Sequence, residues 1–230
     1  MKWFFSYDSG FFRVLDKIGS LFVLNMLTLL CSIPLITIGA AFTALYYVTM
    51  KMVRDEETYV TKDYFRSFKQ NFIQSTVIWL VLLVTGGILV FDYRLMALNR
   101  EILAPARVIM ILTLSGGVFL AVEQAYVFPV LAKFYNTTGQ TMKNAFIMGI
   151  RHFPKTVVII FINLVFPAIT LVGLLRNGKS LLAPLYICLG FAVTAYTNSF
   201  IFVKIFDQYI PIETGDSSES AGDNYDETGA

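Results

Sequence analysis

The sequence predicts an all-α integral membrane protein, a polytopic bundle of about six transmembrane helices. Hydrophobic residues make up 56% of the 230 residues and charged residues only 15%, whereas a soluble domain usually carries about 25% charge. The apolar residues also gather in runs close to the ~20 residues that a helix needs to cross a bilayer. A chain this apolar suits lipid, where apolar surface faces an apolar solvent.

Four runs have the length of a membrane span: 72–91, 108–132, 156–175 and 181–203. The region Ile18–Met50 is too long for one span and contains Pro34. Two short helices, about Lys17–Cys31 and Ile38–Val53, joined by a tight turn would fit this region. One long helix kinked at the proline is the alternative, because membrane helices tolerate proline.

The distribution of basic residues favours two helices in this region. With two, both termini share one side of the membrane, and that side carries 13 of the 18 Lys and Arg residues. With one kinked helix, the same residues divide 10 to 8. Because cytoplasmic segments are enriched in Lys and Arg, we expect a multi-pass protein of the cell membrane with six helices and both termini in the cytoplasm.

The chain ends in a segment of different composition. Residues 211–230 are rich in Gly, Ser and acidic residues and poor in apolar ones. Segments of this kind cannot bury enough apolar surface to fold. We therefore expect a transmembrane helical domain over residues 1–210 and a disordered acidic tail over 211–230.

An internal repeat indicates a duplicated helical hairpin. Residues 44–65 align without gaps with residues 125–146, at an offset of 81 residues, and Phe65 aligns with Phe146. Further on, Asn71-Phe72 aligns with His152-Phe153. Each copy has a membrane helix, an amphipathic segment and the next membrane helix, so we expect two hairpins related as a parallel repeat.

The amphipathic segments, about Thr58–Asn71 and Thr138–His152, are predicted to be interfacial connectors between spans. Apolar side chains three and four residues apart share one helix face. On the first connector these are Tyr64, Phe65, Phe68 and Phe72, and on the second Met142, Ala145, Phe146, Gly149, Ile150 and Phe153. The connectors could anchor the protein at the lipid surface or dock a cytoplasmic partner. The candidate docking residues are Phe65, Arg66, Lys69, Phe146, Arg151 and His152.

Glu123 is an acid inside an apolar run. It lies ten residues before Lys133, which places it about 15 Å deep in the membrane. A carboxylate is costly at that depth, so it should face the bundle interior. It could form a proton or cation site, or it could be a neutral acid hydrogen-bonded to another helix. The candidate partners are Asn25, Asn163 and Asn198, each in a different apolar run.

The sequence shows no enzyme motif. It lacks a Gly-rich phosphate loop, a cluster of His and Cys ligands and a nucleophile elbow. His152 is the one histidine and has no neighbouring ligands for zinc. We therefore expect a protein that is not an enzyme, with no cofactor, no metal and no nucleic-acid partner.

Three segments carry a resemblance to a known family. These are the run Pro34–Tyr47, the triplet Arg54-Asp55-Glu56 and the run Asp63–Phe72. Together they resemble the YesL-like family of bacterial membrane proteins, a domain of unknown function, over roughly residues 1–210 and most strongly in the first seventy. The acidic tail lies outside the resemblance.

The resemblance implies a role rather than a site. Members of this family accompany carbohydrate ABC importers, glycoside hydrolases and two-component regulators in Gram-positive bacteria. This implies an accessory role in carbohydrate uptake or sensing, with the lipid bilayer and importer subunits as partners, and it transfers no functional residues. The alternative is a transporter or channel with a midplane site around Glu123.

Overall fold

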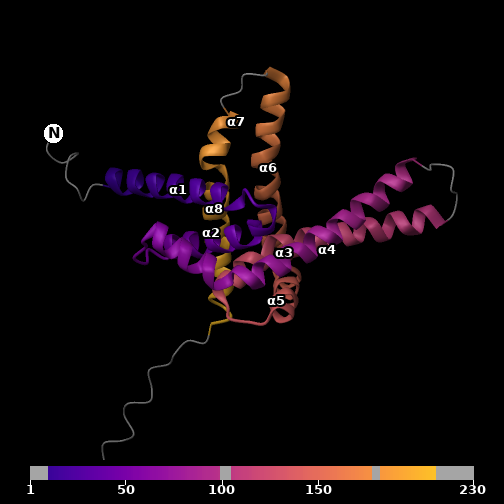
Figure 1. Cartoon of the computed structure of the whole chain (residues 1–230), viewed down its shortest axis with the longest axis horizontal. Helices are drawn as coiled ribbons and strands as arrows, with labels where there is room; N and C mark the ends of the chain where they lie inside the picture. The colour runs from indigo at the N-terminus through magenta and orange to yellow at the C-terminus, as the bar shows by residue number, and fades with distance from the viewer. Residues whose placement is uncertain (1–9, 99–104, 178–181, 211–230) are drawn as a thin grey trace, which may run out of the picture.

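The protein is helical in every regular element of the part that the structure describes. In the computed structural model these residues are 10–98, 105–177 and 182–210 (Figure 1). The predicted acidic tail lies outside them. The elements are α1 (Gly10–Ser32), the short 3-10 helix η1 (Leu35–Thr37), α2 (Ile38–Val53), α3 (Val60–Leu98), α4 (Pro105–Lys133), α5 (Thr138–Arg151), α6 (Phe153–Asn177), α7 (Leu182–Leu185), the π-helical turn η2 (Tyr186–Gly190) and α8 (Phe191–Phe206).

Six candidate spans are present, as the basic-residue distribution predicted. The described residues hold six helical segments long and apolar enough to cross a membrane. The segment around Pro34 forms two helices, because the chain there is extended, with φ −73° and ψ 118°, before η1 leads into α2. The expected bounds of the second helix, Ile38–Val53, are those observed for α2.

Helix α2 lies at the centre of the molecule. It packs against α1, α3, α4 and α8, and most of its residues are buried. Gly39 permits the closest approach, since a Cβ at this position would lie 2.5 Å from the backbone oxygen of Ser75 on α3. Small residues commonly let membrane helices approach in this way.

The end of α2 is capped by a turn with a left-handed residue. Asp55 has a φ of 52°, a conformation that Asp tolerates better than most residues. The backbone N–H of Asp55 donates to the Met52 carbonyl, and the N–H of Glu56 donates to the Lys51 carbonyl. These two bonds form a Schellman motif, which ends the helix and turns the chain towards α3.

The first predicted connector is not a separate element. Most of the predicted segment Thr58–Asn71 forms the first turns of α3, which begins at Val60 and continues unbroken to Leu98. The second connector is a separate helix, α5, begun by a capping box between Thr137 and Gln140. The repeat explains the difference: Ile73 of α3 corresponds to Pro154, and a proline would remove a helix hydrogen bond and clash with the preceding turn.

The predicted apolar stripes are correct only in part. Tyr64 and Ala145 are fully buried, but Phe65, Ile150 and Phe153 are exposed. The buried face instead includes Asp63 and Ser67 on α3 and Met148 on α5. Both segments pack against other helices, so their protein-facing sides are set by close contacts as well as by hydropathy.

Two pairs of positions matched by the predicted duplication have similar environments. Ile78 and Ile159, which are 81 residues apart, are both fully buried. At another matched pair, the Ser75 hydroxyl donates to the carbonyl of Asn71 at 2.6 Å, and the Thr156 hydroxyl donates to that of His152 at 3.2 Å. The two copies therefore share burial and hydrogen bonding at these matched positions, although the break between α5 and α6 has no counterpart in α3.

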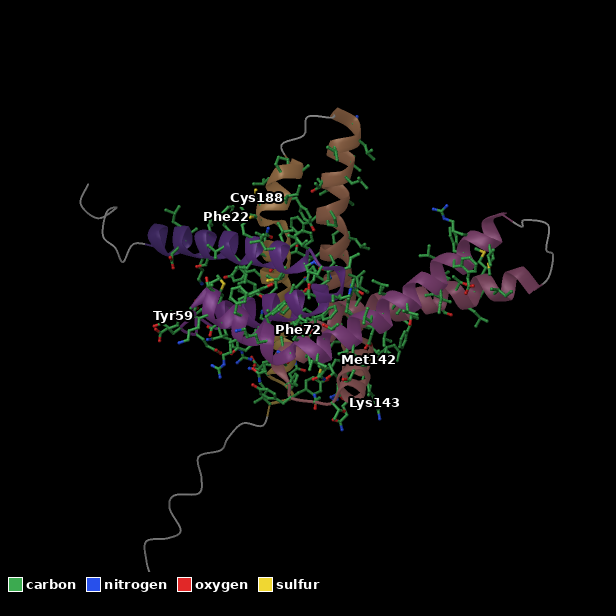
Figure 2. All side chains as sticks on the ribbon, viewed as in Figure 1. Phe22, Tyr59, Phe72, Met142, Lys143 and Cys188 are labelled. Atoms are coloured by element: carbon green, nitrogen blue, oxygen red, sulfur yellow. The ribbon has the colours of Figure 1, made fainter. Side chains whose placement is uncertain are left out.

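Two hairpins extend from the core in different directions. The paired helices α3 and α4 project to one side, whereas α6 and the α7–α8 segment project along another (Figure 1). Their outer surfaces carry many exposed apolar side chains, with only 17% of the most apolar window of α3 and 6% of that of α6 buried (Figure 2). Lipid is the solvent that suits these surfaces.

Candidate functional site

Glu123 is enclosed by the helices around α4. Glu123 is only 1% exposed to solvent. Neither carboxyl oxygen has a hydrogen-bond partner among the described residues. Buried polar groups are normally paired, so this acid is an exception that invites a functional explanation.

The three asparagines predicted as partners of Glu123 bind elsewhere. Asn25 donates to the carbonyl of Ile187 at 2.7 Å and accepts from the backbone N–H of Ala192 at 3.0 Å. Asn198 donates to the side-chain oxygen of Asn163 at 2.7 Å. None of these candidate partners is therefore hydrogen-bonded to Glu123, and the amides join α1 to α8 and α6 to α8 instead.

The first set of predicted docking residues forms an exposed surface. Phe65, Arg66 and Lys69 all lie on the first turns of α3 and are exposed, with Phe65 at 38%. Nearby, Asp63 is directed inward and pairs with Lys51 of α2 at 2.8 Å. The inward acid leaves the basic side chains to dominate the outer face, which we call the α3 basic face (Phe65, Arg66 and Lys69).

The second set is engaged with the protein itself. The Phe146 ring lies 4.6 Å from that of Phe119 on α4. Arg151 lies over the ring of Tyr209, with its guanidinium carbon 5.6 Å from the ring centre. His152 Nε2 lies 3.1 Å from the hydroxyl of the same tyrosine. These residues therefore hold α5 against α4 and against the segment that follows α8.

The environment of His152 disfavours its charged form. Partial burial lowers the pKa of the imidazole, and the positive charges of Lys155 and Arg151 lower it further. The neutral ring can exchange a hydrogen bond with Tyr209 as donor or acceptor, depending on its tautomer. The site has no second histidine, and the described ranges contain no group of three residues suited to hold a metal.

Three ion pairs at one end of the helices were not predicted from the sequence. Lys17 of α1 pairs with Asp55 at 2.9 Å, and Arg54 pairs with Asp207 after α8. The third pair joins Lys51 of α2 to Asp63 of α3. The sequence signal for these pairs was the presence of opposite charges at the ends of successive apolar runs. The three ion pairs place these helix ends at one level.

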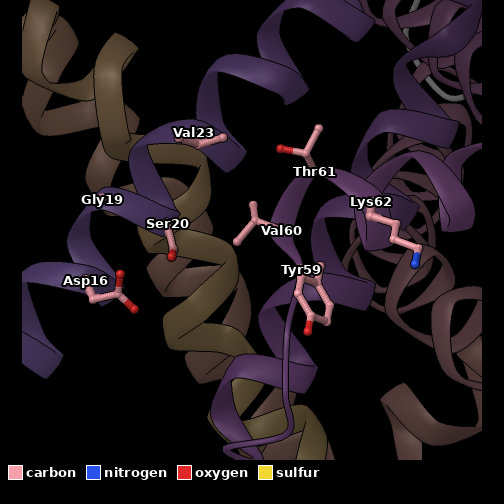
Figure 3. Close-up of a pocket in the computed structure, with 8 residues that line it drawn as sticks. All are labelled: Asp16, Gly19, Ser20, Val23, Tyr59, Val60, Thr61 and Lys62. Carbon is pink, nitrogen blue, oxygen red and sulfur yellow. The ribbon is translucent and has the colours of Figure 1, made fainter.

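Two open grooves lie near this end of the molecule. The larger, of about 540 Å³, lies between α1 and the start of α3 (Figure 3), and its lining residues are Asp16, Gly19, Ser20, Val23, Tyr59, Val60, Thr61 and Lys62. The smaller, of about 380 Å³, is lined by Gln70, Asn71, Gln74, Leu131, Phe134, Tyr135, Asn136, Thr137 and Gln140. Neither groove includes Glu123, so the buried acid and the surface grooves are separate features.

The apolar helices and their exposed apolar surfaces define a multi-pass integral membrane protein. Residues 21–93 match the family described as "Protein of unknown function, DUF624". This match confirms the predicted resemblance to the YesL-like family over the second half of α1, all of α2 and most of α3. No curated protein and no solved structure matches the chain.

Proposed function

We propose that this membrane protein is a non-enzymatic accessory component of carbohydrate uptake or sensing, which docks a partner protein through the α3 basic face. The observation that supports docking is the exposure of Phe65 beside Arg66 and Lys69 at the end of a spanning helix. Aromatic residues and arginine are enriched at the centres of protein interfaces. Carbohydrate as the cargo, and importer subunits as the partner, are supported by the family resemblance.

The proposal places both termini and the α3 basic face in the cytoplasm. The excess of Lys and Arg on that side supports this orientation. The ion pairs Lys17–Asp55 and Lys51–Asp63 also belong to this side. Fusion of a reporter that is active only in the cytoplasm to the C-terminus tests the orientation, and an inactive, stably inserted fusion would overturn it.

Affinity purification in mild detergent tests the docking. The wild-type protein should recover subunits of a carbohydrate ABC importer from the native membrane, and the variant Phe65→Ala/Arg66→Ala/Lys69→Ala should recover much less. The matched control is Tyr93→Ala/Arg94→Ala, which changes an exposed aromatic residue and an exposed cation near the other end of α3. Recovery of the wild-type protein without importer subunits, or equal recovery by both variants, contradicts the proposal.

A transporter or channel is the second candidate function, and Glu123 is the observation that favours it. The acid is 1% exposed and unpartnered, and intramembrane acids commonly mark ion or proton pathways. Proteoliposomes report proton or sugar flux directly. A flux that is lost in Glu123→Gln but kept in the surface control Gln124→Ala supports this function, and a flux unchanged by Glu123→Gln removes the acid from the mechanism.

A further inference from the structure

We propose that α1 and α2 form a re-entrant hairpin, whose turn at residues 32–37 lies inside the membrane and not on its far side. The inference concerns how the chain sits in the bilayer. It is independent of the docking and transport functions above, because it rests only on helix lengths, contacts and exposure.

Each limb of the hairpin is shorter than the hydrocarbon layer when it is measured from the ion pairs to the turn, although α1 and α2 have the overall length of candidate spans. Lys17 of α1 and Lys51 of α2 are tied to acids at the same end of the molecule, so they mark the level at which the hairpin enters. Ser32 follows Lys17 by fifteen residues, and Thr37 precedes Lys51 by fourteen. At 1.5 Å per residue the limbs rise about 22 Å and about 21 Å, short of the ~30 Å hydrocarbon layer.

Helix α3 gives a second, independent measure of depth. The Trp79 indole N–H donates to the carbonyl of Leu35 at 2.7 Å, so Trp79 is level with the turn. It follows Phe72 by seven residues and precedes Phe91 by twelve, within a run that holds no charged residue. The turn therefore lies about 10 Å above one end of that run and about 18 Å below the other.

Several backbone carbonyls in and beside the turn accept hydrogen bonds from the protein, as a turn in lipid requires. The Thr37 hydroxyl lies 2.5 Å from the carbonyl oxygen of Cys31 and 2.7 Å from that of Pro34. The N–H of Ile33 donates to the Leu30 carbonyl, and the N–H of Thr37 donates to that of Pro34. With the bond from Trp79, four carbonyls in and beside the turn have protein donors and do not depend on water.

The outer surface of the turn is apolar. Ile33, Leu35 and Ile36 are 74%, 68% and 53% exposed, and residues 18–50 include no charged side chain. A turn in water usually presents polar residues. Three large exposed aliphatic side chains on so short a turn match hydrocarbon.

This arrangement leaves four crossings, made by α3, α4, α6 and the α7–α8 segment. Both limbs of the hairpin open on one side, so the termini still share a side. Beyond the turn, α3 and α4 continue through the far half of the layer without α1 and α2 beside them (Figure 1).

Depth measurement by electron paramagnetic resonance tests the inference. Single cysteines at Ile33 and Ile36, in a Cys31→Ser/Cys188→Ser background, carry a nitroxide label in phosphatidylcholine and phosphatidylglycerol vesicles. Val84→Cys, 58% exposed within α3, is the control for hydrocarbon, and the exposed Arg94→Cys is the control for water. Each label is compared for collision with oxygen, which enters lipid, and with a water-soluble nickel chelate.

The labels at Ile33 and Ile36 should behave like the label at Val84, with frequent oxygen collisions and little access for the chelate. Chelate access equal to that of the label at Arg94 would place the turn in water and overturn the inference. The positions are exposed, so labelling should preserve the fold. Elution at the wild-type volume and circular dichroism check this for each variant, and an impermeant maleimide applied to intact cells gives a second readout in the native membrane.

Discussion

Asn25 and Ala192 are joined by a hydrogen bond in which the side-chain oxygen of Asn25 accepts from the backbone N–H of Ala192 at 3.0 Å. The same amide donates to the carbonyl of Ile187 at 2.7 Å. Ile187 lies in the π-helical turn η2, and Ala192 lies just beyond it. A π turn interrupts the regular ladder of backbone bonds, and here a side chain of α1 bonds a backbone carbonyl within the turn and a backbone N–H just beyond it.

Replacing this amide should loosen α1 from α8. Asn25→Leu keeps the branched shape but removes the side-chain partner of a backbone donor and a backbone acceptor, so we expect the free energy of unfolding to fall by about 2 kcal/mol. Unfolding in mixed micelles with increasing sodium dodecyl sulfate, followed by circular dichroism, measures the change. Thr197→Ala is the control, because that hydroxyl bonds only to its own helix, at the Val193 carbonyl. An equal loss in both variants would contradict the bridging role.

The partly buried pair of Lys51 and Asp63 should matter more than the exposed pair of Lys17 and Asp55. The side chains of the first pair are 21% and 10% exposed, and those of the second 44% and 79%. Lys51→Met leaves a carboxylate unpaired between α2 and α3 and should cost about 3 kcal/mol. Lys17→Met should cost less than about 1 kcal/mol.

The same unfolding assay compares these two variants. The double variant Lys51→Met/Asp63→Leu should recover much of the stability, because it leaves no unpaired charge. A double variant as unstable as Lys51→Met alone would show that the loss comes from packing and not from the unpaired acid.

Gly39 should be the more sensitive of two intramembrane glycines. A methyl group there would meet the backbone of Ser75 and the Cβ of Trp79, whereas Gly87 has no atom within 4 Å of the same position. Gly39→Ala must push α2 and α3 apart, and we expect a loss of about 1–3 kcal/mol. Gly87→Ala should leave the free energy of unfolding nearly unchanged. Equal stability of the two variants would mean that α2 and α3 do not pack as described.

Acid should weaken the attachment of the segment after α8. The pKa of His152 in the folded protein is lowered below its ordinary value of about 6.5 by burial and by Lys155 and Arg151. The unfolded chain therefore binds the proton more readily. The contribution of neutral His152 to stability is present above about pH 6.5 and declines as the pH falls towards the lowered pKa.

Nuclear magnetic resonance of carbon-labelled histidine measures this pKa directly, because the sequence contains one histidine. Between pH 8 and pH 5, the wild-type protein should lose more stability than His152→Gln, which cannot titrate. A midpoint at or above 6.5 would contradict the lowered pKa.

The sequence was sufficient to predict the helices but not their continuity. Hydropathy placed the spans and the break at Pro34, because both depend on local composition. It did not show that the segment before Phe72 continues into α3, since an amphipathic segment can lie in an interface or extend a span. The contrast between Ile73 and Pro154 within the repeat was the missing signal.

The candidate site was predictable only in its position along the chain. The burial of Glu123 followed from its depth in an apolar run. The absence of a partner for Glu123 within the described part of the chain did not follow from the sequence, because the asparagines bond elsewhere. Asn25 bonds the carbonyl of Ile187 in η2, and Asn198 bonds Asn163. Packing among distant segments of the chain decides which helices are in contact. The hydrophobic periodicity of a single segment does not reveal these contacts.

Because α3 is one uninterrupted helix, a tilt at one of its ends displaces the other end. Its 39 residues form a rod about 58 Å long, with the α3 basic face near one end and Arg94 near the other. A partner that tilts the first turns would swing the opposite end by a comparable distance, without any change inside the helix. In the second copy, the break between α5 and α6 at His152 allows the two helices to change their relative angle. The two copies would therefore respond differently to the same displacement: α3 would tilt as one rigid helix, whereas the second copy would bend at His152.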